Sequence, residues 1–190
     1  MSELTILNLE ENQLSGQIPS WLVNLTQLTA LEGSLFELVN LQYLFLNSNN
    51  LTGTVELHML SKLKNLTGLL LSGNRLSLLS YTRTNATLPT FKLLGLASCN
   101  LTRFPDLQNQ NELEILILTE NKIYGPIPKW VWNISKETLR ALDLSGNFLT
   151  DYNLIVTCCK GHFQFHHHQP LNIQSLEINW QEKFRHLYVT

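Results

Sequence analysis

A repeated motif constrains the fold of this chain more than any other feature of its 190 residues. The clearest copy, LEILILTENKI, begins at Leu113, with leucine at the first, fourth and sixth positions and asparagine at the ninth. Weaker copies begin at Leu4, Leu41, Leu66, Phe91 and Leu139. The last five copies start 25, 25, 22 and 26 residues apart, a period typical of proteins in which each repeat forms one turn of a coil.

The spacing of the apolar residues predicts one short β-strand in each repeat. In L-x-x-L-x-L the fourth and sixth positions point to one face of a strand, because side chains alternate along it. The rest of each repeat must return the chain, so that successive strands lie parallel and about 4.8 Å apart. We therefore expect an α/β-type solenoid, a right-handed superhelix with a parallel concave sheet and short helical or irregular turns on its convex side.

Asparagine at the ninth position predicts a structural ladder inside the coil. A turn packed there leaves backbone groups without water, and an asparagine amide can both donate to them and accept from them. We interpret the recurring residues as this ladder and not as a catalytic row: Asn12, Asn49, Asn74, Asn121 and Asn147. Cys99 takes the same slot in another repeat, where a small buried thiol is the favoured interpretation.

The repeats divide the chain into two parts. Residues 1–150 are predicted to form the array, about six to seven repeats, with an irregularity near 28–40 where a repeat is too short to complete a turn. Residues 151–190 have no repeat periodicity and are predicted to be irregular, with a possible last strand at 173–178. The histidines at 162 and 166–168, near Cys158 and Cys159, match no zinc-ligand spacing, so no metal site is expected.

Composition excludes several classes of function. A net charge of −2 with 15% charged residues offers no basic field for nucleic acid. The sequence contains no run of 18 apolar residues that would predict a membrane span, and its first residues do not match a signal peptide. The motif supplies neither a nucleophile with a base at fixed spacing nor a glycine-rich phosphate loop, so we expect no enzyme and no cofactor.

N-x-S/T sequons favour an origin in the secretory pathway. They are more frequent than chance placement of asparagine, serine and threonine would give, although asparagine and threonine also recur at fixed repeat positions. The predicted glycosylation sites are Asn24, Asn50, Asn65, Asn85, Asn100 and Asn133.

The turn sequences make the chain resemble a known family. G-Q-I-P, G-P-I-P and L-D-L-S-G-N are similar to the plant extracellular class of leucine-rich repeats. L-A-S-C-N-L…F-P-D-L, followed by N-K-I-Y-G-P-I-P-K-W, resembles the receptor-like proteins of plant immunity. The resemblance covers about residues 4–150 and implies a protein- or peptide-binding module in defence signalling. It further implies a co-receptor kinase as partner, at the extracellular face of the plasma membrane.

Two other interpretations stay open. The first is a secreted inhibitor of cell-wall-degrading enzymes, built on the same repeat. The second is a non-functional truncated fragment, because the sequence lacks the signal peptide, caps and membrane helix of the family it resembles and looks like an internal slice of an ectodomain.

The concave face is the predicted ligand site. Several x positions of L-x-x-L-x-L are large and apolar there, and an exposed apolar band with aromatic anchors often marks a partner site. For Ile115 and Ile117 the alternative is that they only satisfy strand propensity. The predicted ligand-binding residues, including the polar rim, are Tyr43, Phe45, Gln42, Asn47, Lys92, Leu93, Glu114, Ile115, Ile117 and Thr119.

Overall fold

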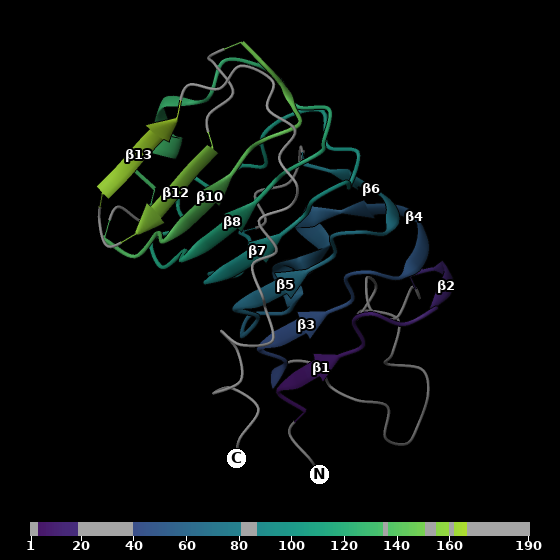
Figure 1. Cartoon of the computed structure of the whole chain (residues 1–190). Helices are drawn as coiled ribbons and strands as arrows, with labels where there is room; N and C mark the ends of the chain where they lie inside the picture. The colour runs from purple at the N-terminus through teal and green to yellow at the C-terminus, as the bar shows by residue number, and fades with distance from the viewer. Residues whose placement is uncertain are drawn as a thin grey trace.

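The main sheet stacks one short strand from each repeat. A computed structural model describes residues 4–18, 40–80, 87–134, 137–150, 155–159 and 162–166. The strand order is β1-β3-β5-β7-β8-β10-β12-β13 (Figure 1), and the first six strands pair in parallel. These six are β1 (Ile6–Asn8), β3 (Tyr43–Phe45), β5 (Gly68–Leu70), β7 (Leu93–Gly95), β8 (Ile115–Ile117) and β10 (Ala141–Asp143). The predicted parallel sheet of a leucine-rich solenoid is confirmed.

Leucines of the motif form one continuous core behind this sheet. Leu66, Leu69 and Leu71 of a central repeat are 0%, 0% and 2% exposed, and the matching positions of the neighbouring repeats pack on them. Burying a leucine side chain contributes about 1.5–3 kcal/mol, so this column is the main source of stability. Leu4 and Leu7 of the first repeat are partly buried against this core, and among the described strands β1 pairs with β3 alone.

A second strand follows the ladder position in several repeats, which the sequence analysis did not predict. β2 (Ser15–Gln17), β4 (Asn50–Glu56) and β6 (Arg75–Leu79) form a three-stranded parallel sheet, and β9 (Tyr124–Gly125) pairs with β11 (Phe148–Leu149). The signal for such a strand in the sequence is the alternation of apolar and polar residues. In β6 the side chains of Leu76 and Leu78 are buried, and those of Arg75 and Ser77 are more exposed. β2, β4 and β6 lie along one side of the main sheet (Figure 1), and the hydrogen bonds Leu78 N to Cys99 O and Lys122 N to Leu101 O continue this side to β9 and β11. We call this side the flank.

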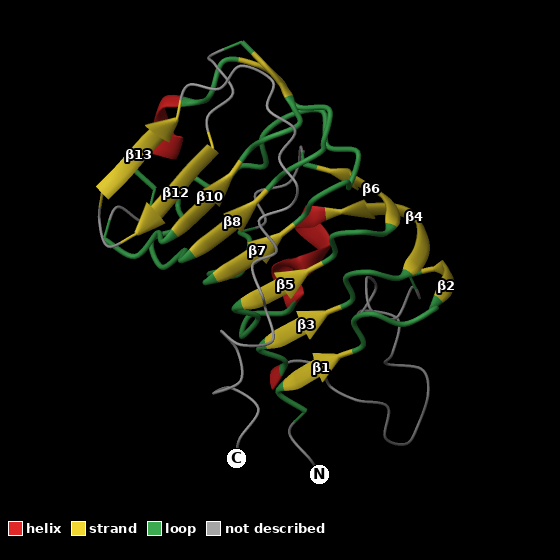
Figure 2. Ribbon diagram, viewed as in Figure 1, coloured by secondary structure: helices red, strands yellow, loops and turns green. Residues whose placement is uncertain are grey.

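Short 3₁₀ helices carry two of the convex returns. They are η3 (Leu57–Lys62) and η4 (Lys129–Trp132), and Figure 2 shows them behind the main sheet. The described part of the chain contains no helix with the length and hydropathy needed to cross a bilayer.

The segment after the repeats contains a β-hairpin where the sequence analysis expected irregular chain. β12 (Ile155–Cys159) pairs antiparallel with β10, and β13 (His162–His166) pairs antiparallel with β12. The expectation was wrong for these residues, because an antiparallel hairpin can extend the sheet without following the repeat period. A two-residue separation ending in glycine, Lys160–Gly161, is a typical hairpin signal. The possible strand at 173–178 and residues 28–39 of the predicted irregularity lie outside the described residues.

Candidate functional site

The strand register arranges the concave positions in two rows across the sheet. One row is Tyr43, Gly68, Leu93, Ile115 and Ala141. The other is Phe45, Leu70, Gly95, Ile117 and Asp143. Parallel pairing without slippage thus places the predicted apolar residues of three repeats, and Leu70 of a fourth, in two adjacent rows.

These apolar residues form a second hydrophobic cluster, separate from the leucine core. Phe45, Leu70, Leu93 and Ile115 are buried, at 4%, 7%, 3% and 7% exposure. Tyr43, Ile117 and Ala141 are partly buried against them. We call these seven residues the concave cluster. The expectation of an exposed apolar band is therefore wrong for Phe45, Leu93 and Ile115, and partial exposure remains at Tyr43 and Ile117.

Two glycines help to explain this burial. A Cβ atom on Gly68 would lie 2.5 Å from Tyr43 Cδ1, and one on Gly95 would lie 2.6 Å from Leu70 Cδ2. The side chains of Tyr43 and Leu70 therefore extend sideways over the glycines of the next strand. The rings of Tyr43 and Phe45 also meet edge to face, with centroids 5.9 Å apart. Neighbouring side chains thus cover one another across the strands.

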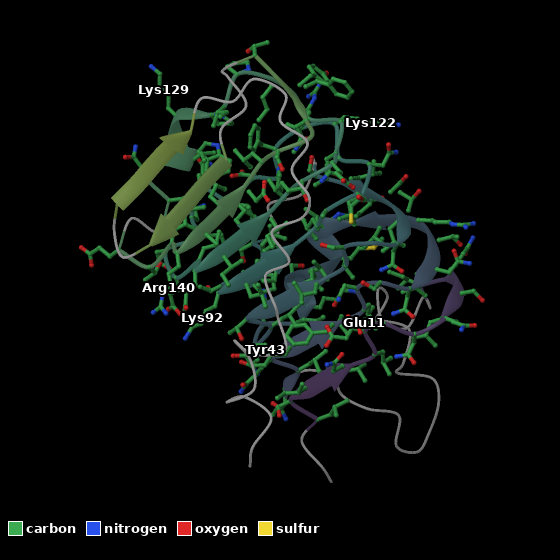
Figure 3. All side chains as sticks on the ribbon, in the orientation of Figure 1. Glu11, Tyr43, Lys92, Lys122, Lys129 and Arg140 are labelled. Atoms are coloured by element: carbon green, nitrogen blue, oxygen red, sulfur yellow. The ribbon has the colours of Figure 1, made fainter. Side chains whose placement is uncertain are left out.

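One rim of the concave face lies where the strands begin. Gln42 and Lys92 are exposed, and their carbonyls hold the sheet by accepting hydrogen bonds from the following strand. Glu114 is half-buried and lies 3.6 Å from the exposed Arg140 (Oε2 to Nε). Figure 3 shows Lys92 and Arg140 at the same end of the strands. An ion pair with this exposure contributes little stability, so both charges stay accessible to a ligand.

The opposite rim, where the strands end, is acidic. Glu10 accepts a hydrogen bond from Asn8, Glu120 accepts one from Ser98 Oγ at 2.9 Å, and Asp143 accepts one from Ser145. Thr119 is half-buried beside Glu120. Asn47 is half-buried as well, and its Oδ1 has no hydrogen-bond partner among the described residues. The two rims thus differ in charge across one sheet.

The ladder residues bind backbone groups of adjacent repeats. Asn121, 4% exposed, accepts from the N–H groups of Cys99 and Leu101 at 3.0 and 2.9 Å. It donates to the carbonyls of Leu96, Leu118 and Thr119. Asn49, Asn74 and Asn147 make the same kind of contacts, whereas Asn12 is exposed and donates only to Leu9 and Glu10.

Cys99 departs from the ladder in its chemistry. It is 0% exposed, and burial raises the pKa of its thiol to about 12. Its Sγ lies 3.4 Å from the Ala97 carbonyl oxygen. A thiol with so high a pKa stays protonated at neutral pH and is a poor nucleophile. Cys99 is therefore part of the core and not of a reactive site.

The described sequons all lie on the surface. Asn50, Asn65, Asn100 and Asn133 are exposed, and Asn100 donates to Ser77 Oγ at 3.1 Å. Asn24 and Asn85 lie outside the described residues, as do the side chains of Cys158, Cys159 and the histidines from 162 to 168. The described part of the chain contains no group of three or more His, Cys, Asp or Glu side chains placed to hold a metal.

Two aromatic side chains on the flank were missed by the sequence analysis. Tyr124 and Phe148 are 59% and 67% exposed and stand opposite each other on β9 and β11. The matching flank pairs in earlier repeats are polar, for example Ser15 with Asn50 and Thr52 with Arg75. The sequence does contain a signal for this pair: Tyr124 and Phe148 are aromatic at positions where other repeats carry serine, threonine, asparagine or a basic residue.

Comparisons with known proteins agree with this geometry. Family profiles described as leucine-rich repeat match residues 3–25 and 26–76. Receptor like protein 27 of Arabidopsis thaliana is 37% identical over 125 residues, 63% of this chain and 15% of that protein. Receptor like protein 23 of Arabidopsis thaliana is 31% identical over 152 residues, 80% of this chain and again 15% of that protein. The chain thus spans about 15% of the length of these relatives.

Solved structures show the same fold. The plant peptide hormone receptor RGFR1 in complex with RGF2 superposes with a TM-score of 0.56 at 29% identity, over 77% of this chain and 21% of that one. The Arabidopsis receptor kinase HAESA, in complex with the peptide hormone IDA and the co-receptor SERK1, superposes with a TM-score of 0.60 at 27% identity, over 78% and 23%.

Proposed function

The chain is a leucine-rich-repeat array similar to plant receptor-like proteins, and we propose that it is a protein- or peptide-binding module of a plant cell-surface receptor in defence signalling. The observation that carries the proposal is its match to receptor-like proteins at up to 38% identity, together with its likeness to two receptors solved with bound peptide hormones. The relatives named above are receptor-like proteins, which favours this role over a secreted enzyme inhibitor.

The proposed ligand site is the concave face. Tyr43 and Ile117 offer apolar surface at the edges of the concave cluster. Gln42, Lys92 and Glu114 offer polar and charged groups on one rim, and Asn47 and Thr119 lie near the other. An extended peptide that crosses the strands would meet a new strand about every 4.8 Å and could contact both rims. Recognition would rest on these contacts alone, without covalent chemistry.

The proposed setting is the extracellular face of the plasma membrane. The array would comprise residues 1–150, with residues 151–190 as a C-terminal segment. N-linked glycans are proposed at the exposed Asn50, Asn65, Asn100 and Asn133. A co-receptor kinase is the proposed signalling partner, because HAESA was solved with the co-receptor SERK1.

Site-specific photo-crosslinking tests the concave assignment. A photoreactive amino acid would replace Gln42 on the concave rim or Lys129 on the convex helix, both of which are exposed. Each protein would be illuminated with the secreted peptide fraction of plant and microbial cultures, and adducts would be measured by mass spectrometry. We expect peptide adducts at position 42 and none at 129. Adducts only at position 129, or at neither position, would contradict the proposal.

A further inference from the structure

The flank carries a rigid, exposed aromatic patch. We call Lys122, Tyr124 and Phe148 the flank patch. Backbone hydrogen bonds fix it, because Lys122 N donates to Leu101 O, Phe148 N to Ile123 O and Thr150 N to Gly125 O, at 2.7, 2.8 and 3.0 Å. Tyr124 and Phe148 are more exposed than any other large apolar side chain in the described part of the chain. Large exposed aromatics on fixed backbone lose little conformational entropy on binding, so they are suited to anchor a partner.

Basic residues outnumber acidic ones on the flank. The flank segments are residues 13–17, 50–56, 75–79, 100–104, 122–126 and 148–150. They contain three exposed basic residues, Arg75, Arg103 and Lys122, and none of these forms an ion pair with a described residue. Their one acidic residue is Glu56, whose Oε2 lies 3.0 Å from His58 Nδ1. Carboxylates of a partner would complement these exposed basic residues.

No residue of the flank patch belongs to a sequon. Asn50 and Asn100 stand in earlier flank segments, and no sequon falls within residues 122–126 or 148–150.

We propose that the flank patch docks a second protein, whose surface presents an apolar side chain beside carboxylates. The ring of Phe148 has no hydrogen-bonding atom and is 67% exposed, so an apolar side chain of a partner would complement it. The carboxylates match the unpaired Lys122 and the more distant Arg103 and Arg75. This surface is separate from the concave cluster, so the proposal does not rest on the concave ligand site.

Subtractive selection from a random-peptide phage library tests the proposal. The library is bound to the full-length chain and then depleted on the Lys122→Glu/Tyr124→Ser/Phe148→Ser variant, which leaves only clones that need the flank patch. The replaced side chains of Tyr124 and Phe148 are more than half exposed and Lys122 is exposed, so the variant keeps the core. An unchanged thermal melting curve checks this.

We expect the surviving peptides to combine acidic and apolar residues. Synthetic copies should bind the variant at least tenfold more weakly than the original chain, and their affinity should fall as salt rises. The matched control Tyr43→Ser/Lys92→Glu, on the concave face, should bind them unchanged. The proposal is overturned if no clone survives depletion, if the survivors are basic or lack apolar residues, or if an acidic oligosaccharide such as oligogalacturonate displaces them.

Discussion

At the scale of single residues, the asparagine ladder links neighbouring repeats. Each internal ladder amide serves backbone groups of two repeats, as Asn121 does with Cys99 and Leu101 on one side and Leu118 and Thr119 on the other. A buried backbone group that loses its partner costs about 1–3 kcal/mol. The ladder therefore couples the stability of one repeat to that of the next.

We expect Asn121→Leu to lower the free energy of unfolding by at least about 3 kcal/mol, because it leaves several buried N–H and C=O groups without partners. Urea denaturation followed by circular dichroism measures this. Asn12→Leu is the matched control, since Asn12 is exposed and bonds only carbonyls of its own repeat. Equal losses in the two variants would show that the ladder contacts do not carry the effect.

Cys99 should make stability depend on pH above about 9. A thiol is neutral when protonated, so burial favours the proton. The folded chain holds it up to pH about 12, whereas the unfolded chain releases it near the ordinary value of 9.0. Stability is therefore complete below pH 9 and falls as the pH rises towards 12.

The comparison is with Cys99→Asn, in a Cys158→Ser/Cys159→Ser background. This variant lacks the thiol and places an amide at the ladder position. The Leu51 N–H donates to Asn74 and the Leu101 N–H donates to Asn121, and Leu76 occupies the matching position opposite residue 99. From pH 8 to pH 10, the free energy of unfolding should fall by more in the background protein, which keeps Cys99, than in the Cys99→Asn variant. Rapid labelling of Cys99 by a thiol reagent in the folded state would contradict the assignment.

At the scale of elements, the concave cluster depends on glycine in the neighbouring strand. β5 begins with Gly68, which leaves room for the Tyr43 ring of β3. Added atoms in a packed apolar site force neighbours to shift and typically cost about 1–3 kcal/mol. The ring of Tyr43 is planar and also meets Phe45, so it has few other positions.

We expect Gly68→Ala to destabilise the chain by about 1–3 kcal/mol, and Tyr43→Ala to remove most of this additional cost. A double-mutant cycle from thermal or urea unfolding gives the coupling between the two positions. Gly95→Ala is the milder comparison, because its Cβ would meet the flexible end of Leu70. Additive effects of Gly68→Ala and Tyr43→Ala would refute the contact between Tyr43 and the neighbouring strand.

At the scale of the whole molecule, stability should vary along the coil. Leu9 and Leu14 of the first repeat are 37% and 39% exposed, whereas the matching Leu71 and Leu76 of a central repeat are each 2% exposed. In a stacked array each repeat is stabilised by its neighbours, so a repeat with one neighbour opens more easily.

Native-state hydrogen exchange measures this difference in stability between repeats, at backbone amides that make equivalent hydrogen bonds. Leu9, Leu71 and Leu96 each donate their N–H to the next repeat at 2.9 Å, so the hydrogen bond itself is the same. We expect the Leu9 amide to exchange fastest and the Leu71 and Leu96 amides to approach the exchange rate set by global unfolding. Equal protection of all three would show that the coil opens as a single cooperative unit.

The features that recur in every repeat could be predicted from the amino-acid order alone. A period in the twenties specified one parallel strand per turn, and the asparagine position specified which side chain meets the turn backbone. These features depend on spacing within one repeat, which a single sequence displays directly.

The contacts between different repeats became visible only in the folded chain. The burial of Phe45, Leu93 and Ile115 depends on which side chain the register places beside each one, and the glycines of β5 and β7 matter only once they face Tyr43 and Leu70. Tyr124 and Phe148 are more than 20 residues apart in sequence and become one surface only through the pairing of β9 with β11. Contacts between repeats depend on the strand register and on the volume of neighbouring side chains, and the motif of one repeat encodes neither.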